Sequence, residues 1–273
     1  MSLRKLLAAD PVDGAFTLAS RDSSVTPLID SKKKGKNDLD EMGERLFDLH
    51  EMMFAGEQRS ILLVLQGTDA SGKNGTIKHV ISRVNPAGVS NAEFAVPTDE
   101  EAEHHFLWRI RPEVPTPGKL AVFSRSHYED VIIPLAEQSE DDAEIDSRFD
   151  DIADFEAELT KSGVAVVKCL LNISYDEQRE RFLRRLRRPD KRWKFAEADL
   201  ETRRNWDSYQ MAAGETVARS STDDEPWFVI PADHKWYRNW AIAKILLEVL
   251  DDMDLSYPEP DLDLDSLREA LDD

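Results

Sequence analysis

The residues most able to do chemistry form a glycine-rich loop directly after an apolar run. Residues 67–76 read Gly-Thr-Asp-Ala-Ser-Gly-Lys-Asn-Gly-Thr and follow the aliphatic residues 61–65. A G-x-x-x-x-G-K pattern between a strand and a helix is typical of a loop whose backbone N–H groups and lysine bind phosphate. The pattern therefore predicts a phosphorylated ligand. The residues predicted to bind it are Gly67, Ala70, Ser71, Gly72, Lys73, Asn74, Gly75 and Thr76.

The same loop differs from the usual pattern in its metal-binding residue. Lys73 is commonly followed by Ser or Thr, whose hydroxyl holds Mg²⁺, but here Asn74 follows. Asp69 lies inside the loop, and a carboxylate is a hard oxygen ligand that suits Mg²⁺. We infer that metal binding has partly moved to Asp69. The alternative, a chance match, is disfavoured because the flanking strand and helix signals also fit.

A basic segment lies far from the loop in sequence. Its arginines recur at i, i+3, i+4 and i+7, so they share one helical face, and Pro189 then ends the helix. Guanidinium groups placed so closely need anions, which could be the protein's own carboxylates or the phosphates of a ligand. In the second case the segment is a lid that closes over the transferring group. The predicted anion contacts are Arg181, Arg184, Arg185, Arg188, Lys191 and Lys194.

A second candidate segment, residues 123–130, reads Phe-Ser-Arg-Ser-His-Tyr-Glu-Asp and ends a predicted strand. Open α/β sheets bind their ligands at the carboxyl ends of strands. Arg125 could clamp a phosphate, and Glu129 and Asp130 could hold Mg²⁺ or orient an acceptor. We expect His127 to be structural, because phosphoryl transfer depends on positioning and charge neutralisation more than on an imidazole base.

The elements that position these residues alternate between strand and helix. We predict strands at 61–66, 94–96, 120–123, 164–171 and 227–230, and helices at 38–53, 100–110, 150–161, 175–188, 197–218 and 237–250. This alternation predicts an α/β sandwich of three layers with a parallel sheet. We expect an N-terminal extension and helix (1–55), a kinase-like domain (56–255) with a helical lid (181–215), and an acidic tail (256–273). Residues 1–37 look irregular, and the lysine-rich run 32–36 is either a solvated loop or an additional anion contact.

Composition limits the classes of partner. The 273 residues carry a formal net charge of -20, which argues against nucleic-acid binding and focuses a polyanion onto the few basic clusters. The single cysteine, Cys169, lies in an apolar run, so no disulfide can form within the chain. We found no apolar stretch of membrane-spanning length and no secretory signal. These features predict a cytoplasmic protein with no membrane partner.

Taken together, these segments resemble the second family of polyphosphate kinases. The matching stretches are 67–76, 123–130, 184–195 and 226–236. The resemblance implies a P-loop α/β sandwich with a helical lid, Mg²⁺-dependent transfer between inorganic polyphosphate and adenine or guanine nucleotides, and a homodimer or homotetramer. The form Ser-His-Tyr-Glu-Asp at 126–130 looks like the class that accepts both AMP and ADP. By resemblance, Asp69 organises the metal, and the residues of the reaction are Asp69, Lys73, Arg125, Glu129 and Lys191.

Three other hypotheses remain open. An ATP-dependent nucleoside monophosphate kinase would share the loop and the arginine lid. A non-catalytic polyphosphate- or nucleotide-binding regulator is suggested by Asn74 and by Ala213 and Gly214, where the family usually has an aromatic residue and an acid. A nucleic-acid-binding module built on the basic helix is disfavoured by the net charge.

Overall fold

The computed structural model describes residues 2–11 and 13–272; Met1, Val12 and Asp273, which fall in the predicted N-terminal extension and C-terminal tail, lie outside the described residues. Its centre is a five-stranded, all-parallel sheet in the order β2-β3-β1-β4-β5. The strands are β1 (Ser60–Gln66), β2 (Val89–Ala92), β3 (Leu120–Ser124), β4 (Val164–Asn172) and β5 (Trp227–Pro231). The α/β prediction is confirmed. The prediction for the second strand, 94–96, was wrong by several residues.

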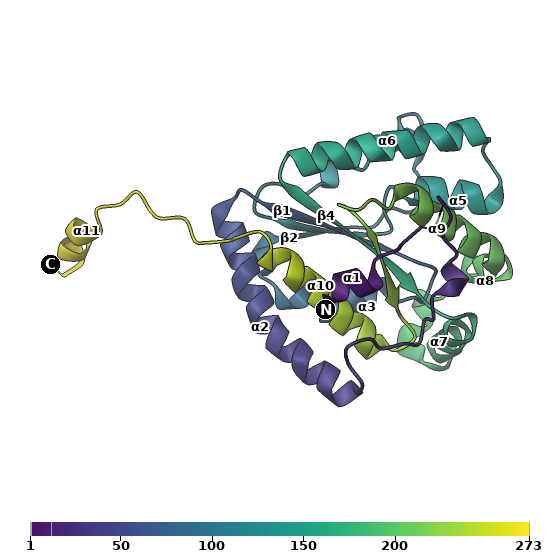
Figure 1. The fold of residues 1–273 in the computed structure, drawn as a ribbon, viewed down its shortest axis with the longest axis horizontal. Helices are drawn as coiled ribbons and strands as arrows, with labels where there is room; N and C mark the ends of the chain where they lie inside the picture. The colour runs from purple at the N-terminus through teal and green to yellow at the C-terminus, as the bar shows by residue number, and fades with distance from the viewer. Residues whose placement is uncertain (1, 12, 273) are drawn as a thin grey trace.

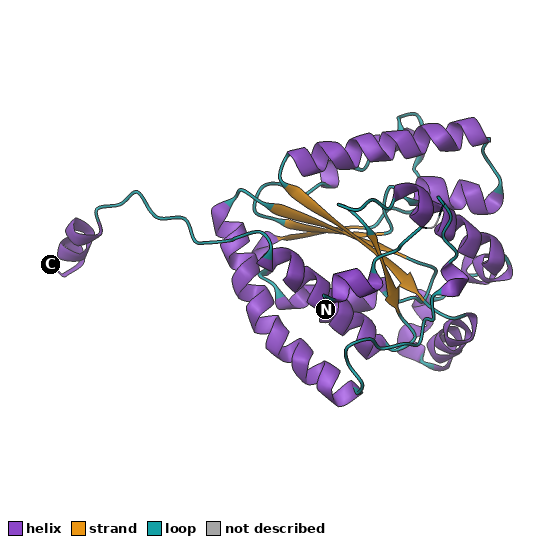
Figure 2. Cartoon of the chain, viewed as in Figure 1, coloured by secondary structure: helices purple, strands orange, loops and turns teal. Residues whose placement is uncertain are grey.

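Helices cover both faces of the sheet, which explains why its strands are aliphatic rather than alternating. In Figure 1 one layer lies below the sheet and the other above it, and Figure 2 shows the strands enclosed between them. The lower layer contains α1 (Leu3–Leu7), α2 (Lys32–Gly56), α3 (Lys73–His79) and α10 (Lys235–Asp251). The upper layer contains α5 (Glu129–Glu137), α6 (Asp142–Lys161) and α9 (Trp206–Ser220). The remaining helices are α4 (Asp99–Ala102), α7 (Tyr175–Arg187), α8 (Ala198–Arg204) and α11 (Leu264–Asp272).

Each face of β1 supplies one hydrophobic core. Ile61, Leu63 and Leu65 pack with α2 and α10, whereas Leu62 and Val64 pack with α6. Successive side chains of a strand point to opposite faces, so this five-residue run fills both cores. Cys169 of β4 is fully buried and unpaired, and burial raises the pKa of its thiol, as expected for an inert cysteine.

Four predicted helices differ from the structure. The helix predicted at 150–161 is α6, which begins earlier, at Asp142. The N-terminal segment is not irregular up to residue 37, because α2 begins at Lys32. The predicted helix 197–218 is two helices that meet at Asn205. The predicted helix 100–110 is reduced to α4 and short 3₁₀ turns.

The chain order creates a switch point at the end of β1. From β1 the chain crosses to β2 at the edge of the sheet and returns to form β3 beside β1; it then passes to β4 on the other side of β1. The carboxyl end of β1 therefore opens between two diverging connections, where α/β proteins bind their ligands.

Two peripheral observations complete the fold. After α10 the chain leads away from the body and ends in α11 (Figure 1). Among the described residues, the helices are too short or too polar to cross a bilayer.

Candidate functional site

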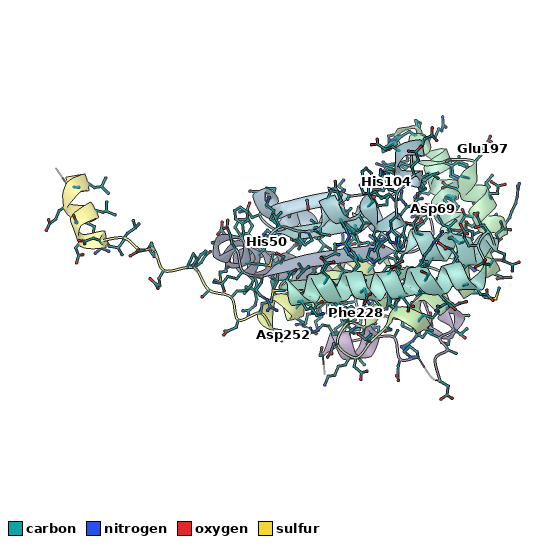
Figure 3. All side chains as sticks on the ribbon, turned by 90° about the horizontal axis from the view of Figure 1, so that it is seen from above. His50, Asp69, His104, Glu197, Phe228 and Asp252 are labelled. Atoms are coloured by element: carbon teal, nitrogen blue, oxygen red, sulfur yellow. The ribbon has the colours of Figure 1, made fainter. Side chains whose placement is uncertain are left out.

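A large cavity lies at the carboxyl edge of the sheet. Its volume is about 1210 Å³, and it is bordered by the loop after β1, the end of β3, the end of α7, the 3₁₀ segment 189–194 and the start of α10. Figure 3 places Asp69 and Glu197 toward one end of the molecule, opposite His50 and Asp252. The described lining contains 13 Lys or Arg residues and 6 Asp or Glu residues, in a chain whose net charge is -20. This excess of positive charge in one hollow suits a polyanion.

The loop after β1 has a backbone that its glycines make possible. Gly67 (φ +136°) and Gly72 (φ +122°) adopt conformations that side chains rarely tolerate. A Cβ on Gly72 would lie 1.6 Å from Nη1 of Arg238, so a side chain at this position has no space. The loop leads directly into α3 at Lys73, and the first N–H groups of a helix have no partner within the helix.

Lys73, Asp69 and Arg125 form a charged cluster at this loop. Lys73 Nζ donates a hydrogen bond to the Gly67 carbonyl oxygen at 2.5 Å, and Arg125 Nη2 donates to Asp69 Oδ1 at 3.0 Å. Burial opposes the ionised form of Asp69, but Lys73 and Arg125 outweigh this effect and lower the pKa of the carboxyl group. Burial likewise lowers the pKa of Lys73, while Asp69 and Glu129 act to raise it. The three residues that the sequence predicts to take part in the reaction thus lie close together in the structure.

Arg125 occupies an unusual backbone conformation. Its φ is +67°, in the left-handed region that a residue with a Cβ rarely adopts. Such strain costs roughly 1–3 kcal/mol and is found most often at functional sites. Its consequence here is that a guanidinium group from the end of β3 reaches Asp69 of the neighbouring loop.

The two acidic residues after β3 have different surroundings. Burial raises the pKa of Glu129, whereas Lys73 and Arg125 act to lower it, so this carboxyl group belongs to the charged cluster. Neither residue lines the cavity, and Asp130 lies apart from the charged cluster, where it accepts a hydrogen bond from Arg109 Nη2 at 3.1 Å. The structure therefore gives no support to Asp130 as a metal ligand.

The oxygen atoms around Asp69 suit Mg²⁺. Within the described residues, no three His, Cys, Asp or Glu side chains form a metal cluster of their own. Mg²⁺ is commonly held by one or two carboxylates together with substrate phosphates and waters, so a smaller donor set is sufficient. Buried oxygen atoms without a described partner also gather at the ends of β1 and β3, which allows ordered water or an ion to satisfy them. They belong to Gln66, Thr68, Ser71 and Ser124.

The predicted lid arginines divide into two groups, and the first group lines the cavity without strong partners. Arg185 donates to the Lys194 carbonyl oxygen at 3.0 Å and lies 3.5 Å from Asp199 Oδ2. Arg188 forms an exposed pair with Asp190 at 2.8 Å. Arg184 lines the cavity and makes no hydrogen bond or ion pair with the described part of the chain. These guanidinium groups therefore face the cavity with weak partners or none.

Arg181 has a structural position that the sequence pattern did not reveal. It is only 4% exposed, and its Nη1 and Nη2 atoms donate to carbonyl oxygens of the phosphate loop (Ala70, Ser71) and of the end of β5 (Ala232, Asp233). With its donors occupied in this way, Arg181 ties α7 to the loop. We therefore revise the prediction: this side chain positions the site.

Sequence reasoning missed several residues of the cavity, and four of them carry charges near the phosphate loop or the lid. Asp199 faces Asp69, and burial together with the Asp69 charge raises the pKa of Asp199. Burial, Arg181 and Arg184 lower the pKa of Lys235 to about 8. Arg238 underlies the loop and donates to the Ser71 carbonyl oxygen at 3.1 Å, and Glu93 follows β2. Only Lys235 carried a sequence signal, because it belongs to the 226–236 stretch; the other three acquire their position through the fold.

The structure brings most of the predicted residues to the cavity. Those that line it are Asp69, Ala70, Gly72, Lys73, Asn74, Gly75, Arg125, Arg181, Arg184, Arg185, Arg188, Lys191 and Lys194. Gly67, Ser71 and Thr76 lie behind the loop surface, and Thr76 Oγ1 donates to the Gly72 carbonyl oxygen at 3.4 Å. His127 is fully buried beside Glu156, with 3.2 Å between its Nε2 and Glu156 Oε1.

Comparison with known proteins gives the family of this chain. The family model described as polyphosphate kinase 2 (PPK2) matches residues 29–258. The chain belongs to the polyphosphate kinase 2 family. It is 42% identical over 250 residues to an AMP/ADP-polyphosphate phosphotransferase of Meiothermus ruber, covering 91% of this chain and 94% of that one. It is 37% identical to an ADP-polyphosphate phosphotransferase of Rhodopseudomonas palustris, covering 87% of this chain and 86% of that one.

A solved structure supports the same assignment. The crystal structure of Polyphosphate Kinase 2 from Arthrobacter aurescens TC1 matches with a TM-score of 0.95 and 39% identity, covering 99% of this chain and 96% of that one. The predicted P-loop kinase fold is therefore confirmed.

At positions 213 and 214 this polyphosphate kinase 2 family member has small residues in place of the family's usual aromatic residue and acid. The structure shows where these two positions lie. Ala213 is buried, and a Cβ on Gly214 would come within 2.6 Å of the Phe16 carbonyl oxygen. The absence of a side chain at Gly214 therefore makes room for the N-terminal segment, which packs against α9. Neither residue lines the cavity.

Proposed function

We propose that this member of the polyphosphate kinase 2 family transfers phosphoryl groups between inorganic polyphosphate and nucleotides, with AMP and ADP as acceptors. The observation that carries the proposal is a phosphate loop inside a strongly cationic cavity of a strongly acidic protein. The Meiothermus ruber relative, named for AMP and ADP, supports the choice of acceptors.

The side chains of the cavity have separable roles in this proposal. Lys73 and the loop hold the phosphate that is transferred, and Arg125 neutralises charge on the same group. Arg185, Lys191 and the other cations of the lid bind the polyphosphate chain. The acceptor is already an anion, so the reaction needs no strong general base. Closing the lid would also exclude water and limit hydrolysis of the donor.

Asp69, with Glu129 or Asp199 near it, would hold Mg²⁺ together with the phosphates of the substrates. A bound Mg²⁺ supplies charge neutralisation and orients phosphoryl oxygens. The ionised state of Asp69, favoured by Lys73 and Arg125, suits this role.

A direct assay tests the function. Purified protein, Mg²⁺ and long-chain polyphosphate are mixed with AMP or ADP in separate reactions, and nucleotides are separated by ion-exchange chromatography. We expect ADP from AMP and ATP from ADP. Product from one acceptor only would overturn the acceptor range and leave the reaction in place.

Parallel reactions with ATP as the donor and without polyphosphate separate the alternatives. Transfer to AMP from ATP alone would favour a nucleoside monophosphate kinase. Binding of polyphosphate without any product would favour the regulator.

We further propose that the protein forms a homodimer or homotetramer, as the family resemblance implies. Size-exclusion chromatography with light scattering measures the mass directly, and a mass of one chain would contradict this proposal.

A further inference from the structure

The first turn of α2 carries an arrangement of charge that opposes helix stability. Lys32, Lys33 and Lys34 are its first three residues, and the first turn contains no acidic residue. The N-terminal end of a helix carries partial positive charge, so cations there are destabilising. Only Ser31, whose side chain accepts from the Lys34 N–H at 3.4 Å, follows the usual capping preference. A locally unfavourable sequence of this kind is expected where function requires it.

Two of the lysines in this helix turn toward the cavity. Lys32 and Lys36 line it together with Lys73, whereas Lys33 and Lys34 do not. Lys32 and Lys36 are four residues apart and so lie on one helical face. The structure thus separates four similar lysines into a cavity-facing pair and an outward-facing pair.

A close contact fixes this helix end against the site. Gly35 is buried, and a Cβ there would lie 2.5 Å from Cε3 of Trp236. The helix backbone therefore rests on the Trp236 ring, directly beside Lys235 of the cavity. Any larger residue than glycine at position 35 would force the helix and the Trp236 ring apart.

The cavity-facing pair has no carboxylate partner in the described residues. No ion pair of Lys32 or Lys36 occurs there, and the nearby Asp40 is paired with Arg83 at 2.6 Å. In a chain with 55 acidic residues this leaves two cations for an external anion.

The cavity that the pair lines also contains the phosphate loop. A cavity of about 1210 Å³ exceeds the roughly 300–1,000 Å³ of ordinary small-ligand pockets, so it has room for a ligand larger than a nucleotide.

We propose that Lys32 and Lys36 form an outer subsite for the distal phosphates of a long polyphosphate chain whose end is held at the phosphate loop. This inference rests on the proposed function and deepens it: the N-terminal helix makes the enzyme favour long donors over short ones. The ligand class is a linear polyanion, because a chain of many phosphates can contact the phosphate loop and these two lysines at the same time.

The test compares two double variants with the same change in charge on the same helix. K32Q/K36Q removes the cavity-facing pair, and K33Q/K34Q removes the outward-facing pair as the control. We expect K32Q/K36Q to raise the KM for long-chain polyphosphate about 10-fold, equivalent to about 1.4 kcal/mol, without changing kcat. The KM for tripolyphosphate should not change, and K33Q/K34Q should match the original protein with both donors.

Salt dependence gives a second signature. Each phosphate contact that is lost makes the plot of log affinity against log salt concentration less steep. We expect a shallower slope for K32Q/K36Q with long chains, measured by equilibrium binding as well as by KM. Thermal melting of both variants controls for folding.

The outcomes that overturn the proposal are distinct. Equal KM changes in both double variants would show that the effect comes from the net charge of the helix and does not depend on which lysines face the cavity. An equal change with tripolyphosphate would place the lysines at the inner site. If the original protein binds polyphosphate but transfers nothing, the proposed function fails, while equilibrium binding of long and short chains still decides the outer subsite.

Discussion

Asp69→Asn should separate catalysis from stability at the phosphate loop. The substitution preserves the shape of the side chain and removes a charge that Lys73 and Arg125 stabilise. The side chains of Asp69 and Arg125 are 25% and 31% exposed, and partly exposed ion pairs contribute roughly 0–1 kcal/mol. We therefore expect the free energy of unfolding to fall by no more than about 1 kcal/mol. The transfer rate should fall at least ~100-fold, equivalent to about 2.7 kcal/mol of transition-state stabilisation.

The kinetic pattern of Asp69→Asn is as informative as its size. Loss of this carboxylate leaves two cations without their anion, so the KM for polyphosphate should not rise. The loss should appear in kcat, measured by the nucleotide assay, with urea unfolding on the same samples. Asp40→Asn is the matched control, since Asp40 also lines the cavity and pairs with an arginine but is 70% exposed. Its rate should stay within roughly 5-fold.

Two results would refute this reasoning. A near-normal kcat for Asp69→Asn would remove the residue from the reaction. A fall in unfolding free energy of several kcal/mol would mean that the carboxylate acts on the fold, and the rate loss would then carry no information about chemistry.

Three further predictions concern the lid, the core and the pH dependence. Arg185→Ala and Lys191→Ala should raise the KM for polyphosphate more than that for the nucleotide, and equal rises in steady-state assays would contradict the lid assignment. Glu156→Gln should lower the free energy of unfolding by about 3–5 kcal/mol in urea titrations, because it leaves Lys168, 1% exposed and 2.8 Å from the carboxylate, as an unpaired buried charge. Lys235, with a pKa of about 8, loses its charge as the pH rises from 7 to 9. The KM for polyphosphate should therefore rise up to about 5-fold over this interval at constant ionic strength, and less in Lys235→Gln.

The parts of the site that local sequence could predict are those governed by local geometry. The glycine pattern after the aliphatic run predicted the phosphate loop, because strand, turn and helix follow one another within a few residues. Arg125 was found for the same reason, since the end of a strand in a parallel sheet marks the ligand edge. Both inferences depend on neighbouring residues and need no knowledge of tertiary packing.

Residues whose roles depend on packing could not be assigned in this way. Arg181 has the same helical spacing as the lid arginines, but α7 places it against four carbonyl oxygens. Asp199 resembles any acidic residue of a polar helix until the fold brings it to Asp69. The start of α2 was missed because three lysines disfavour a helix N-terminus, whereas the contact between Gly35 and Trp236 stabilises it there.

The two interpretations of the basic segment, pairing with the protein's own carboxylates or with phosphates, describe successive states of the same side chains. Asp190 lies 2.8 Å from Arg188 and 3.6 Å from Lys191, and all three side chains are more than 40% exposed. Exposed pairs of this kind contribute at most about 1 kcal/mol, whereas phosphate oxygens accept stronger, charge-assisted hydrogen bonds from arginine. A polyphosphate chain can therefore displace Asp190, while the buried Arg181 keeps its carbonyl partners and anchors the helix.

Asp190→Asn tests this exchange. Removing the competing carboxylate should lower the KM for polyphosphate by up to about 5-fold, with kcat unchanged, because the arginine and lysine start without a partner. Steady-state assays with polyphosphate as the varied substrate measure the effect, and Asp146→Asn, which breaks a surface pair with Arg219 outside the cavity, is the control. A higher KM in Asp190→Asn would show that the carboxylate shapes the lid for its ligand, and the exchange argument would then be wrong.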